Sequence, residues 1–442
     1  MIGVIADDFT GATDVAAALR RAGLRTLLYF GVPEPGKSTP EGGGRAAPPP
    51  GHDALVVALK SRMLPAPDAV ARSLEALAWL RRCGARHFYL KFCSTFDSTP
   101  DGNIGPVLDA LADALAAPTV LLTPSSPEHL RTVYRGHLFV DDQPLAESAM
   151  RHHPVTPMTD SSVPRLLRAQ TDRPVESLCW ETVREGTAAV RAALATSGAR
   201  GTRYVIADAL DADDLRTLGA AAGAAPLTAG AAGLAGGLAH AHATTVTYAD
   251  DEASGTGESP ETGPAAVLCG SCSARTREQL GVLTGLGRPA HRLDPVTEPD
   301  PAALAGQALA WYDALPPGEA PVFSSSLPPD RLRETQRALG AERAAAVLER
   351  ATGLIAAGLV ERGVRRVITA GGETSGAVVT ALGVTAGWIG AEAAPGVPWI
   401  HPTSGPRIAL LLKSGNFGAP DLLATASAGP SSRSTPSGGL HP

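Results

Sequence analysis

Short apolar runs alternate along the chain with longer stretches in which apolar residues recur at helical spacing. The first run, Ile2–Ala6, has the β-branched composition of a buried strand. Apolar residues then follow at helical spacing, at Val15, Leu19 and Ala22. Gly23 ends the pattern. This opening segment therefore predicts a strand, a polar loop and a helix.

The same alternation continues over most of the chain. Further strands are predicted at 26–30, 54–59, 87–92, 120–123, 204–208, 265–269, 322–324, 367–370 and 408–412. Helices are predicted at 67–83, 107–116, 181–195, 331–362 and 377–382, with another that begins at about Ala274. Strands that alternate with helices are typical of parallel sheets. We therefore predict an α/β fold with two domains, each a mostly parallel sheet flanked by helices.

Three stretches interrupt this alternation. Residues 249–264 form an acidic Gly/Ser/Pro tract without apolar periodicity, which predicts a linker between a domain at 1–248 and a domain at 265–426. Residues 427–442 are mostly Ser, Pro and Gly and predict a disordered tail. Residues 124–164 are rich in proline, histidine and polar residues, and they predict an irregular segment.

The composition argues against several classes of partner. The 442-residue chain has a formal net charge of −6 and 4% aromatic residues, which does not suit nucleic acid. No apolar run approaches the ~20 residues that a spanning helix needs, and the first residues lack a signal-peptide pattern. We therefore expect no nucleic-acid or membrane partner and a cytoplasmic location. Cys269 and Cys272 form a lone CxxC pair, so no metal site is predicted.

Only four of the 38 basic residues are lysines, and three of them follow strand-like runs: Lys60, Lys91 and Lys413. An ammonium group at a strand end suits a carboxylate or a phosphate as a point charge. The fourth, Lys37, completes a GxxxxGK[ST] pattern at residues 31–38. The prolines in this stretch remove N–H groups that such a loop offers to phosphates, so we do not interpret it as a nucleotide site.

Polar loops follow several of the predicted strands. The loop at 7–14 comes after the first strand, where ligands bind in open α/β sheets. The segment 91–106 is dense in hydroxyls and carboxylates, which suits a polyol. The segment 370–376 places adjacent glycines before a helix, a geometry that favours phosphate, and a further glycine-rich loop follows at 413–418. Phosphoryl transfer between two lobes is therefore the natural hypothesis.

Six motifs along the chain are recognisable, in the order IADDFTGATDVA, YLKFCSTFDSTPDGNIGPV, ESAMRHHPVTPM, ITAGGETSG, APGVPW and LKSGNFG. Together they resemble the four-carbon acid sugar kinase family, and within it the 3-oxo-tetronate 4-kinase branch. The resemblance runs from residue 1 to about residue 425. It implies an ATP-dependent kinase that phosphorylates the 4-hydroxyl of a 3-oxo-tetronate. It also implies that the amino-terminal domain holds the sugar acid and the carboxy-terminal domain holds ATP.

The residue types and the resemblance together suggest roles in the first domain. Lys91, assisted by Lys60 and Arg62, is expected to pair with the substrate carboxylate. Asp7 or Asp8 is expected to contact the substrate hydroxyls, and one of them to accept the proton of the attacking hydroxyl. The other expected substrate contacts are Thr10, Ser94, Thr95 and Asp97.

The nucleotide contacts are implied by the resemblance. They are Ser273, Gly371, Gly372, Glu373, Thr374 and Gly415. Mg²⁺ is expected to bridge the ATP phosphates, with Glu373 holding it through water. The expected partners are thus a sugar acid and ATP, and a homodimer is left open.

Two segments depart from the family pattern. Residues 125–132 read SSPEHLRT where the family usually has ALPVNGRT, and residues 228–235 read TAGAAGLA where it tends to have TGGSGLA. A kinase for threonate or erythronate, or a non-catalytic sugar-acid-binding protein, are therefore the alternatives. A phosphatase is disfavoured because its nucleophile and acid stand two residues apart, whereas Asp7 and Asp8 are adjacent. A dehydrogenase is disfavoured because no GxGxxG follows a predicted strand.

Overall fold

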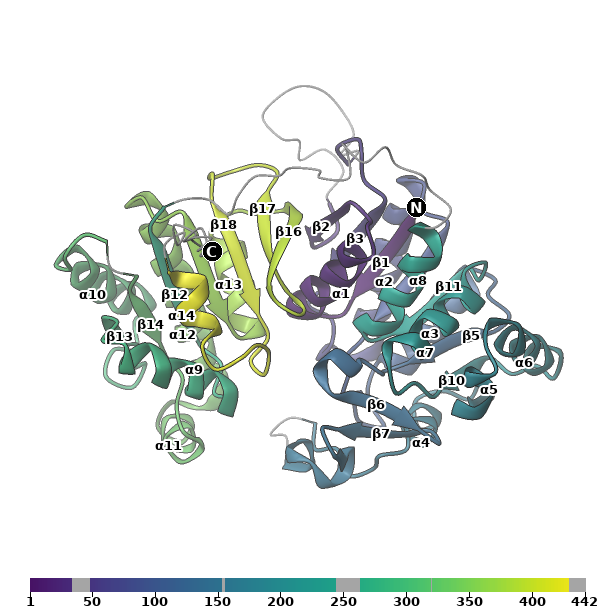
Figure 1. Cartoon of the computed structure of the whole chain (residues 1–442). Helices are drawn as coiled ribbons and strands as arrows, with labels where there is room; N and C mark the ends of the chain where they lie inside the picture. Colours follow the sequence, from purple (N-terminus) through teal and green to yellow (C-terminus); the bar gives the residue numbers. More distant parts are fainter. Residues whose placement is uncertain (34–47, 153–155, 244–262, 319, 429–442) are drawn as a thin grey trace, which may run out of the picture.

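The computed structural model describes residues 1–33, 48–152, 156–243, 263–318 and 320–428. Two halves lie side by side and share one sheet (Figure 1). The predicted linker falls outside the described residues except for its last two positions. The predicted tail also falls outside them after residue 428, and Ser427 ends a helix. The GxxxxGK[ST] stretch is described only up to Pro33.

The amino-terminal half contains the first set of parallel strands. They are β1 (Ile2–Ala6), β2 (Thr26–Phe30), β3 (Ala54–Ala58), β4 (His87–Lys91), β5 (Val120–Thr123), β9 (Val175–Leu178), β10 (Tyr204–Ala207) and β11 (Leu227–Gly230). The helices of this half are α1 (Phe9–Arg21), α2 (Ala66–Arg82), α3 (Ile104–Ala114), α4 (Val163–Arg168), α5 (Trp180–Arg184), α6 (Thr187–Ala199), α7 (Ala212–Ala222) and α8 (Ala232–Ala243).

The carboxy-terminal half repeats the alternation and adds a hairpin. Its strands are β12 (Ala265–Cys269), β13 (Ala290–Arg292), β14 (Val322–Ser324), β15 (Arg366–Ala370), β16 (Ala386–Ala394), β17 (Val397–Pro402) and β18 (Ala409–Lys413). Its helices are α9 (Ala274–Gly285), α10 (Pro301–Asp313), α11 (Pro329–Leu339), α12 (Ala341–Glu361), α13 (Gly372–Ala381) and α14 (Leu422–Ser427).

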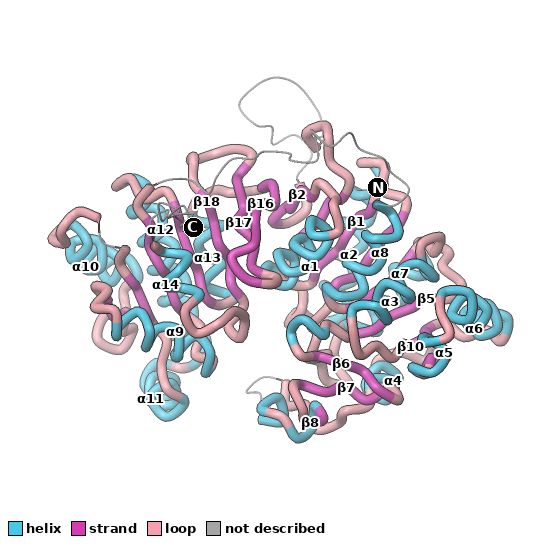
Figure 2. The backbone as a smooth tube through the Cα atoms, in the orientation of Figure 1, coloured by secondary structure: helices cyan, strands magenta, loops and turns pink. Residues whose placement is uncertain are grey.

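The sheet runs in the order β13-β14-β12-β15-β18-β17-β16-β2-β3-β1-β4-β11-β5-β10-β9. The pairs on either side of the centre are parallel, and the β16–β17 hairpin pairs antiparallel with β18 and with β2. Figure 2 shows the strands following one another from one half into the other, with helices flanking them. The predicted α/β class, with mostly parallel strands flanked by helices, is confirmed, and the two predicted sheets form one continuous sheet. The structure adds that the β16–β17 hairpin joins the two sheets edge to edge.

The segment 124–164 is not irregular as predicted. It forms a small antiparallel sheet of β6 (Arg131–Tyr134), β7 (His137–Val140) and β8 (Gln143–Pro144). Short 3₁₀ helices flank it, η1 (Pro127–His129), η2 (Leu145–Glu147) and η3 (Ala149–His152). The strands are too short to show a clear alternation, but Val133 and Leu138 are fully buried and anchor this sheet on the core.

Two helices predicted as continuous are broken by glycine. The stretch 331–362 divides into α11 and α12 at Gly340, whose φ is 82°. The stretch 181–195 divides into α5 and α6 at Gly186, whose φ is 99°. A positive φ cannot continue a right-handed helix, and glycine adopts it without steric cost. The prediction of single helices is therefore wrong at both places.

Helix α1 lies at the junction of the two halves. It packs on β1 and β3 of its own half and on β16 and β17 of the other. The Thr13 hydroxyl donates to the Thr10 carbonyl at 2.8 Å and lies 3.5 Å from the carbonyl of Leu412 in β18. The amino end of α1 therefore meets both halves at the carboxyl edge of the sheet. None of the described helices is long and apolar enough to cross a membrane.

Candidate active site

Asp8 begins helix α1 directly after the buried strand β1. Its Oδ1 accepts a hydrogen bond from the Gly11 backbone N–H at 2.9 Å, and its Oδ2 accepts one from the Thr10 hydroxyl at 2.8 Å. The first of these bonds satisfies one of the N–H groups that the first helical turn leaves without a partner. The chain thus fixes the Asp8 carboxylate at a strand end, where ligands bind in such sheets.

Arg62, which follows β3, binds both aspartates. Its Nε and one terminal nitrogen donate to the two oxygens of Asp7 at 2.8 and 2.7 Å. The same terminal nitrogen donates to Asp8 at 2.6 Å. The predicted substrate contacts Arg62, Asp7 and Asp8 therefore lie together. Arg62 was expected to help bind the substrate carboxylate, whereas in the structure it binds the carboxylates of Asp7 and Asp8.

The two aspartates differ in their electrostatics. Burial raises the pKa of Asp7 despite its contact with Arg62. Burial also opposes ionisation of Asp8. The positive charges of Arg62 and Lys91 and the hydrogen bonds from Thr10 and Gly11 outweigh burial and lower the pKa of Asp8. Asp8 is thus held as a carboxylate at neutral pH. Lys91 lies 2% exposed at the end of β4, and its ammonium donates to the Phe92 carbonyl at 2.9 Å.

The loop after β4 supplies a second polar group. The Thr95 hydroxyl and the Cys93 thiol donate to the two oxygens of Asp97 at 2.5 and 3.1 Å. Burial, together with Asp97, raises the pKa of Cys93 to about 11, so this thiol stays protonated and can donate. Ser94 is half-buried beside them. The sequence singled out Ser94, Thr95 and Asp97 but gave no reason to include Cys93.

In the other half, three loops meet at the carboxyl ends of β12, β15 and β18. Ser273 caps α9 by accepting from the Thr276 N–H at 3.2 Å, and its hydroxyl donates to the Gly415 carbonyl at 2.7 Å. Side chains at Gly270 or Gly415 would overlap the hydroxyls of Thr374 and Ser271. Because glycine stands there, the backbones of the three loops approach closely, as phosphate-binding loops do.

Lys413 contacts these loops from within the core. Its side chain is fully buried, and its ammonium donates to the carbonyls of Ser414 and Gly415 at 2.8 and 3.0 Å. It also lies 3.3 Å from the Thr276 hydroxyl. Burial lowers the pKa of Lys413 to about 8. The sequence marked Lys413 as a strand-end lysine without giving it a place in the site.

A hollow that is open to solvent lies beside the glycine loops. Leu327, Leu332 and Leu348 contribute an apolar wall from α11, α12 and the loop after β14. Glu373 and Thr374 contribute a polar edge at the start of α13. An apolar wall next to a phosphate-binding loop suits a nucleotide, which has a base at one end and phosphates at the other.

The two polar sites face one another across the junction. Lys60, at the end of β3, forms an ion pair with Glu373 at 3.1 Å. A side-chain carbon placed on Gly372 would lie 3.9 Å from the Thr10 hydroxyl. The amino ends of α1 and α13 are therefore close, and both carry the positive end of a helix dipole. An anionic group between them would be stabilised from both halves.

Comparison with known proteins also divides the chain into a sugar-binding part and a nucleotide-binding part. Residues 2–238 match the family model of a sugar-binding N-terminal domain, and residues 266–423 match that of a nucleotide-binding C-terminal domain. A 3-oxo-tetronate kinase from Cupriavidus necator is 46% identical over 423 residues, covering 95% of each chain. The chain belongs to the four-carbon acid sugar kinase family. It is therefore an ATP-dependent phosphotransferase with an alcohol group as acceptor.

Other members and solved structures show the same similarity. A 3-oxo-tetronate kinase from Pseudomonas fluorescens is 46% identical and covers 96% of both chains. A crystal structure of a Salmonella typhimurium protein, provisionally called a tRNA synthase, matches this kinase with a TM-score of 0.83 and 41% identity over 96% of the chain and 98% of its own. A Haemophilus influenzae protein matches with a TM-score of 0.74 and 38% identity, with the same coverage. Both structures share the fold.

Proposed function

We propose that this kinase transfers the γ-phosphate of ATP to the 4-hydroxyl of a 3-oxo-tetronate, giving the 4-phosphate and ADP. The domain at 1–248 holds the sugar acid and the domain at 265–426 holds ATP. The observation that carries this proposal is the approach of the two helix amino ends, with Lys60 and Glu373 paired between them. Phosphoryl transfer is catalysed mainly by positioning and charge stabilisation, which this arrangement supplies.

The sugar acid contacts the polar groups at the carboxyl ends of β1, β3 and β4. Lys91 has three N–H groups, of which one goes to the Phe92 carbonyl, and it pairs with the substrate carboxylate together with Lys60. Asp8 receives the 4-hydroxyl and orients it toward the phosphate. Because Asp8 is held as a carboxylate, it can accept the proton late in the transfer, when a loose transition state requires little of a base. Arg62 positions Asp7 and Asp8, and the hydroxyl groups of Thr10, Ser94 and Thr95 with Asp97 complete the site.

The residues of the other half fit a nucleotide. The cradle that side chains would fill at Gly270 and Gly415 brings backbone N–H groups together for phosphates, as do Gly371 and Gly372 at the start of α13. Ser273 and Thr374 contribute hydroxyls to this cradle. Mg²⁺, when bound, neutralises charge on the phosphates. Glu373 has the exposed carboxylate to hold it through water, once its ion pair with Lys60 opens.

The location and assembly are also proposals. Use of ATP supports a cytoplasmic enzyme. A homodimer would be detected as twice the mass of 45.1 kDa by light scattering.

The test is an ADP-release assay. Purified protein is incubated with ATP, Mg²⁺ and a panel of four-carbon acids that includes 3-oxo-tetronates, threonate and erythronate. The proposal expects ADP release to be fastest with a 3-oxo-tetronate, with the phosphate at the 4-position by NMR of the product. Faster release with threonate or erythronate would identify that acid, and not a 3-oxo-tetronate, as the substrate. Binding of an acid without ADP release would indicate a binding protein instead.

A further inference from the structure

His129 lies where the two halves of the kinase meet, in the segment that departs from the family pattern. It ends η1 after β5, and its Nε2 is 3.1 Å from Oδ1 of Asp14 in helix α1. The side chains of His129 and Asp14 are only 8% and 4% exposed. The hydrogen bond therefore joins the η1 loop to α1, the helix that Asp8 caps.

The other face of the His129 ring contacts the nucleotide half. It stacks on Phe417, with ring centroids 4.0 Å apart and an angle of 21° between the planes. Phe417 belongs to the loop after β18, two residues beyond Gly415, and its carbonyl accepts from the side chain of Gln279 in α9 at 3.2 Å. His129 is thus in direct contact with the loop that we assign to the ATP phosphates.

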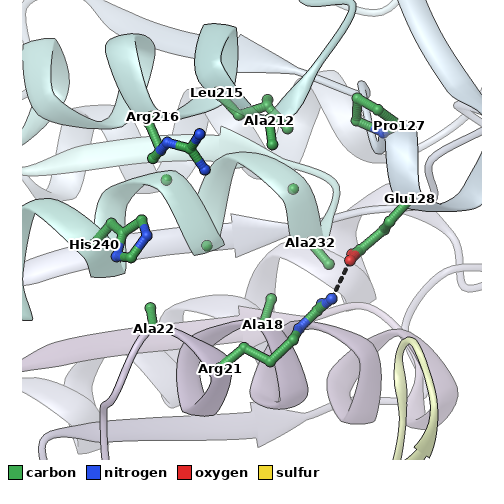
Figure 3. A pocket seen from close by; sticks show the side chains of 13 residues that line it. Ala18, Arg21, Ala22, Pro127, Glu128, Ala212, Leu215, Arg216, Ala232 and His240 are labelled. Atoms are coloured by element: carbon green, nitrogen blue, oxygen red, sulfur yellow. Dashed lines mark hydrogen bonds and ion pairs between the residues drawn. The ribbon is translucent and has the colours of Figure 1, made fainter.

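The turn of the β16–β17 hairpin packs against Asp14 and His129. A side-chain carbon on Gly396 would come within 2.6 Å of Asp14 and 3.0 Å of His129, so the hairpin backbone presses on both. Arg21 forms ion pairs with Glu128 and with Glu392 of the hairpin. Figure 3 shows the pair of Arg21 and Glu128 at the edge of a hollow lined by α1, α7 and α8.

These contacts are satisfied within the protein. Donor atoms of Asp14, Glu128 and His129 lie within 4.8 Å of one another, a spacing that a cation could bridge. Glu128 already forms an ion pair with Arg21, and the carboxylate of Asp14 already contacts the imidazole of His129. The arrangement therefore serves as a mechanical contact between the halves rather than as a metal site.

We propose that His129 is a positioning residue that couples the sugar-acid site to the nucleotide loop. The proposal rests on the function proposed above. A sugar acid that orders the first turn of α1 also fixes Asp14, and through His129 and Phe417 it fixes the loop at Gly415. Each ligand should then raise the affinity for the other by the same factor.

The test measures the Kd of ADP by calorimetry with and without a saturating concentration of 3-oxo-tetronate. In the natural protein we expect the acid to tighten ADP binding at least fivefold. In His129→Asn, which keeps an amide N–H for Asp14 but removes the stacked ring, we expect this ratio to fall to about one. Phe417→Leu removes the other ring and should give the same loss. His137→Asn, an exposed histidine in β7, is the matched control and should keep the natural ratio.

The outcomes separate this inference from the proposed function. If His129→Asn and Phe417→Leu are folded and keep the natural ratio, or if the natural protein shows a ratio of one, the coupling role is wrong while the kinase function stands. If ADP or the acid does not bind the natural protein at all, both proposals are wrong. A double variant that loses no more than either single one would show that the two rings act through their contact.

Discussion

Asp8 caps helix α1 and, in the proposed mechanism, orients the substrate hydroxyl with the same side chain. Its oxygens cap the first turn of α1, and the same oxygens carry a negative charge that Arg62 and Lys91 stabilise. A residue with two roles is difficult to interpret from a mutation, because loss of the cap lowers stability by about 1 kcal/mol whatever happens to the reaction. The substitution must therefore keep one role and remove the other.

Asp8→Asn makes this separation, since asparagine caps helices as well as aspartate does. We expect kcat to fall at least tenfold because the charge that orients the hydroxyl is lost, with little change in Tm. Asp211→Asn is the matched control, since Asp211 caps α7 through the Asp214 N–H in the same way but lies outside the proposed site. Near-natural turnover in a folded Asp8→Asn variant would remove Asp8 from the mechanism.

We expect Lys413 to weaken ATP binding at alkaline pH. Because its pKa is lowered to about 8, half of the Lys413 side chains have lost their proton at about that pH, and each of these has one donor fewer for the loop carbonyls. We expect the KM for ATP to rise between pH 7.5 and 9.5 in the natural enzyme. In Lys413→Met the KM should be high throughout this range and should not vary with pH.

The contribution of Lys413 to the free energy of unfolding is expected to increase with pH while the affinity for ATP falls, and this difference provides the control. Between about 8 and the ordinary lysine value of 10.5, the unfolded chain holds a proton that the folded chain has lost. The contribution of Lys413 to the free energy of unfolding therefore increases as the pH rises through this window. A weaker ATP affinity together with an unchanged or higher contribution to stability would identify a local effect on the loop. A KM for ATP that stays flat to pH 9.5 would contradict the role of Lys413.

The sequence could name many residues of the candidate site but not their partners. Asp7 and Asp8 are visible because a strand ends directly before them. The side chain that neutralises them, Arg62, comes from the end of another strand, and only the order of strands in the sheet shows that the two ends are neighbours. The contact of His129 with Phe417 joins residues in different halves, and no local pattern could indicate it.

Among the secondary-structure elements, the sequence was most informative for buried parallel strands. The predicted bounds of β1, β2, β5, β12 and β14 are those of the structure, because each is a short, mostly apolar run bounded on at least one side by a polar residue, proline or glycine. The hairpin strand β16 was missed. Its sequence, AGWIGAEAA, has little β-branched character, and it becomes a strand because β17 and β2 supply hydrogen-bond partners on both sides.

The packing of α7 against α8 is a sharper test of how glycine positions an element. A side chain at Gly237 would overlap the backbone of Leu215 in α7, whereas one at the neighbouring Gly236 would lie 3.6 Å from Ala18, an ordinary contact. We expect Gly237→Ala to lower the free energy of unfolding by about 2 kcal/mol or more, because the two helices must separate. Gly236→Ala should be neutral or should stabilise by up to ~1 kcal/mol.

Denaturant unfolding followed by circular dichroism measures both variants. The comparison is informative because the two residues lie on the same helix and have the same propensity. Equal stability of the two alanine variants would mean that α7 and α8 do not pack as closely as described.

At the scale of the whole molecule, the two halves share a core. One cluster of buried residues includes Val4 and Val15 from the first half and Val378 and Leu410 from the second. Apolar contacts that cross the junction make the unfolding of one half expose surface on the other. The two halves are therefore expected to unfold together, although each has its own ligand.

Calorimetry checks this expectation. We predict one heat-absorption transition, and ADP alone should move the whole transition to higher temperature. At a hundredfold excess over Kd the added free energy is about 2.7 kcal/mol. Two separate transitions, with only one of them moved by ADP, would contradict a shared core.

The pairing of β2 with β16 also bears on how the chain is made. In the order of synthesis, β2 is complete at Phe30, but its partner begins only at Ala386, about 350 residues later. At roughly 5–20 residues per second, β2 remains the outermost strand of its sheet for roughly 20 to 70 seconds on the ribosome. An uncovered strand edge is a template for pairing with other chains. Chains that terminate before β16 never cover this edge, so premature termination yields a fragment prone to aggregate.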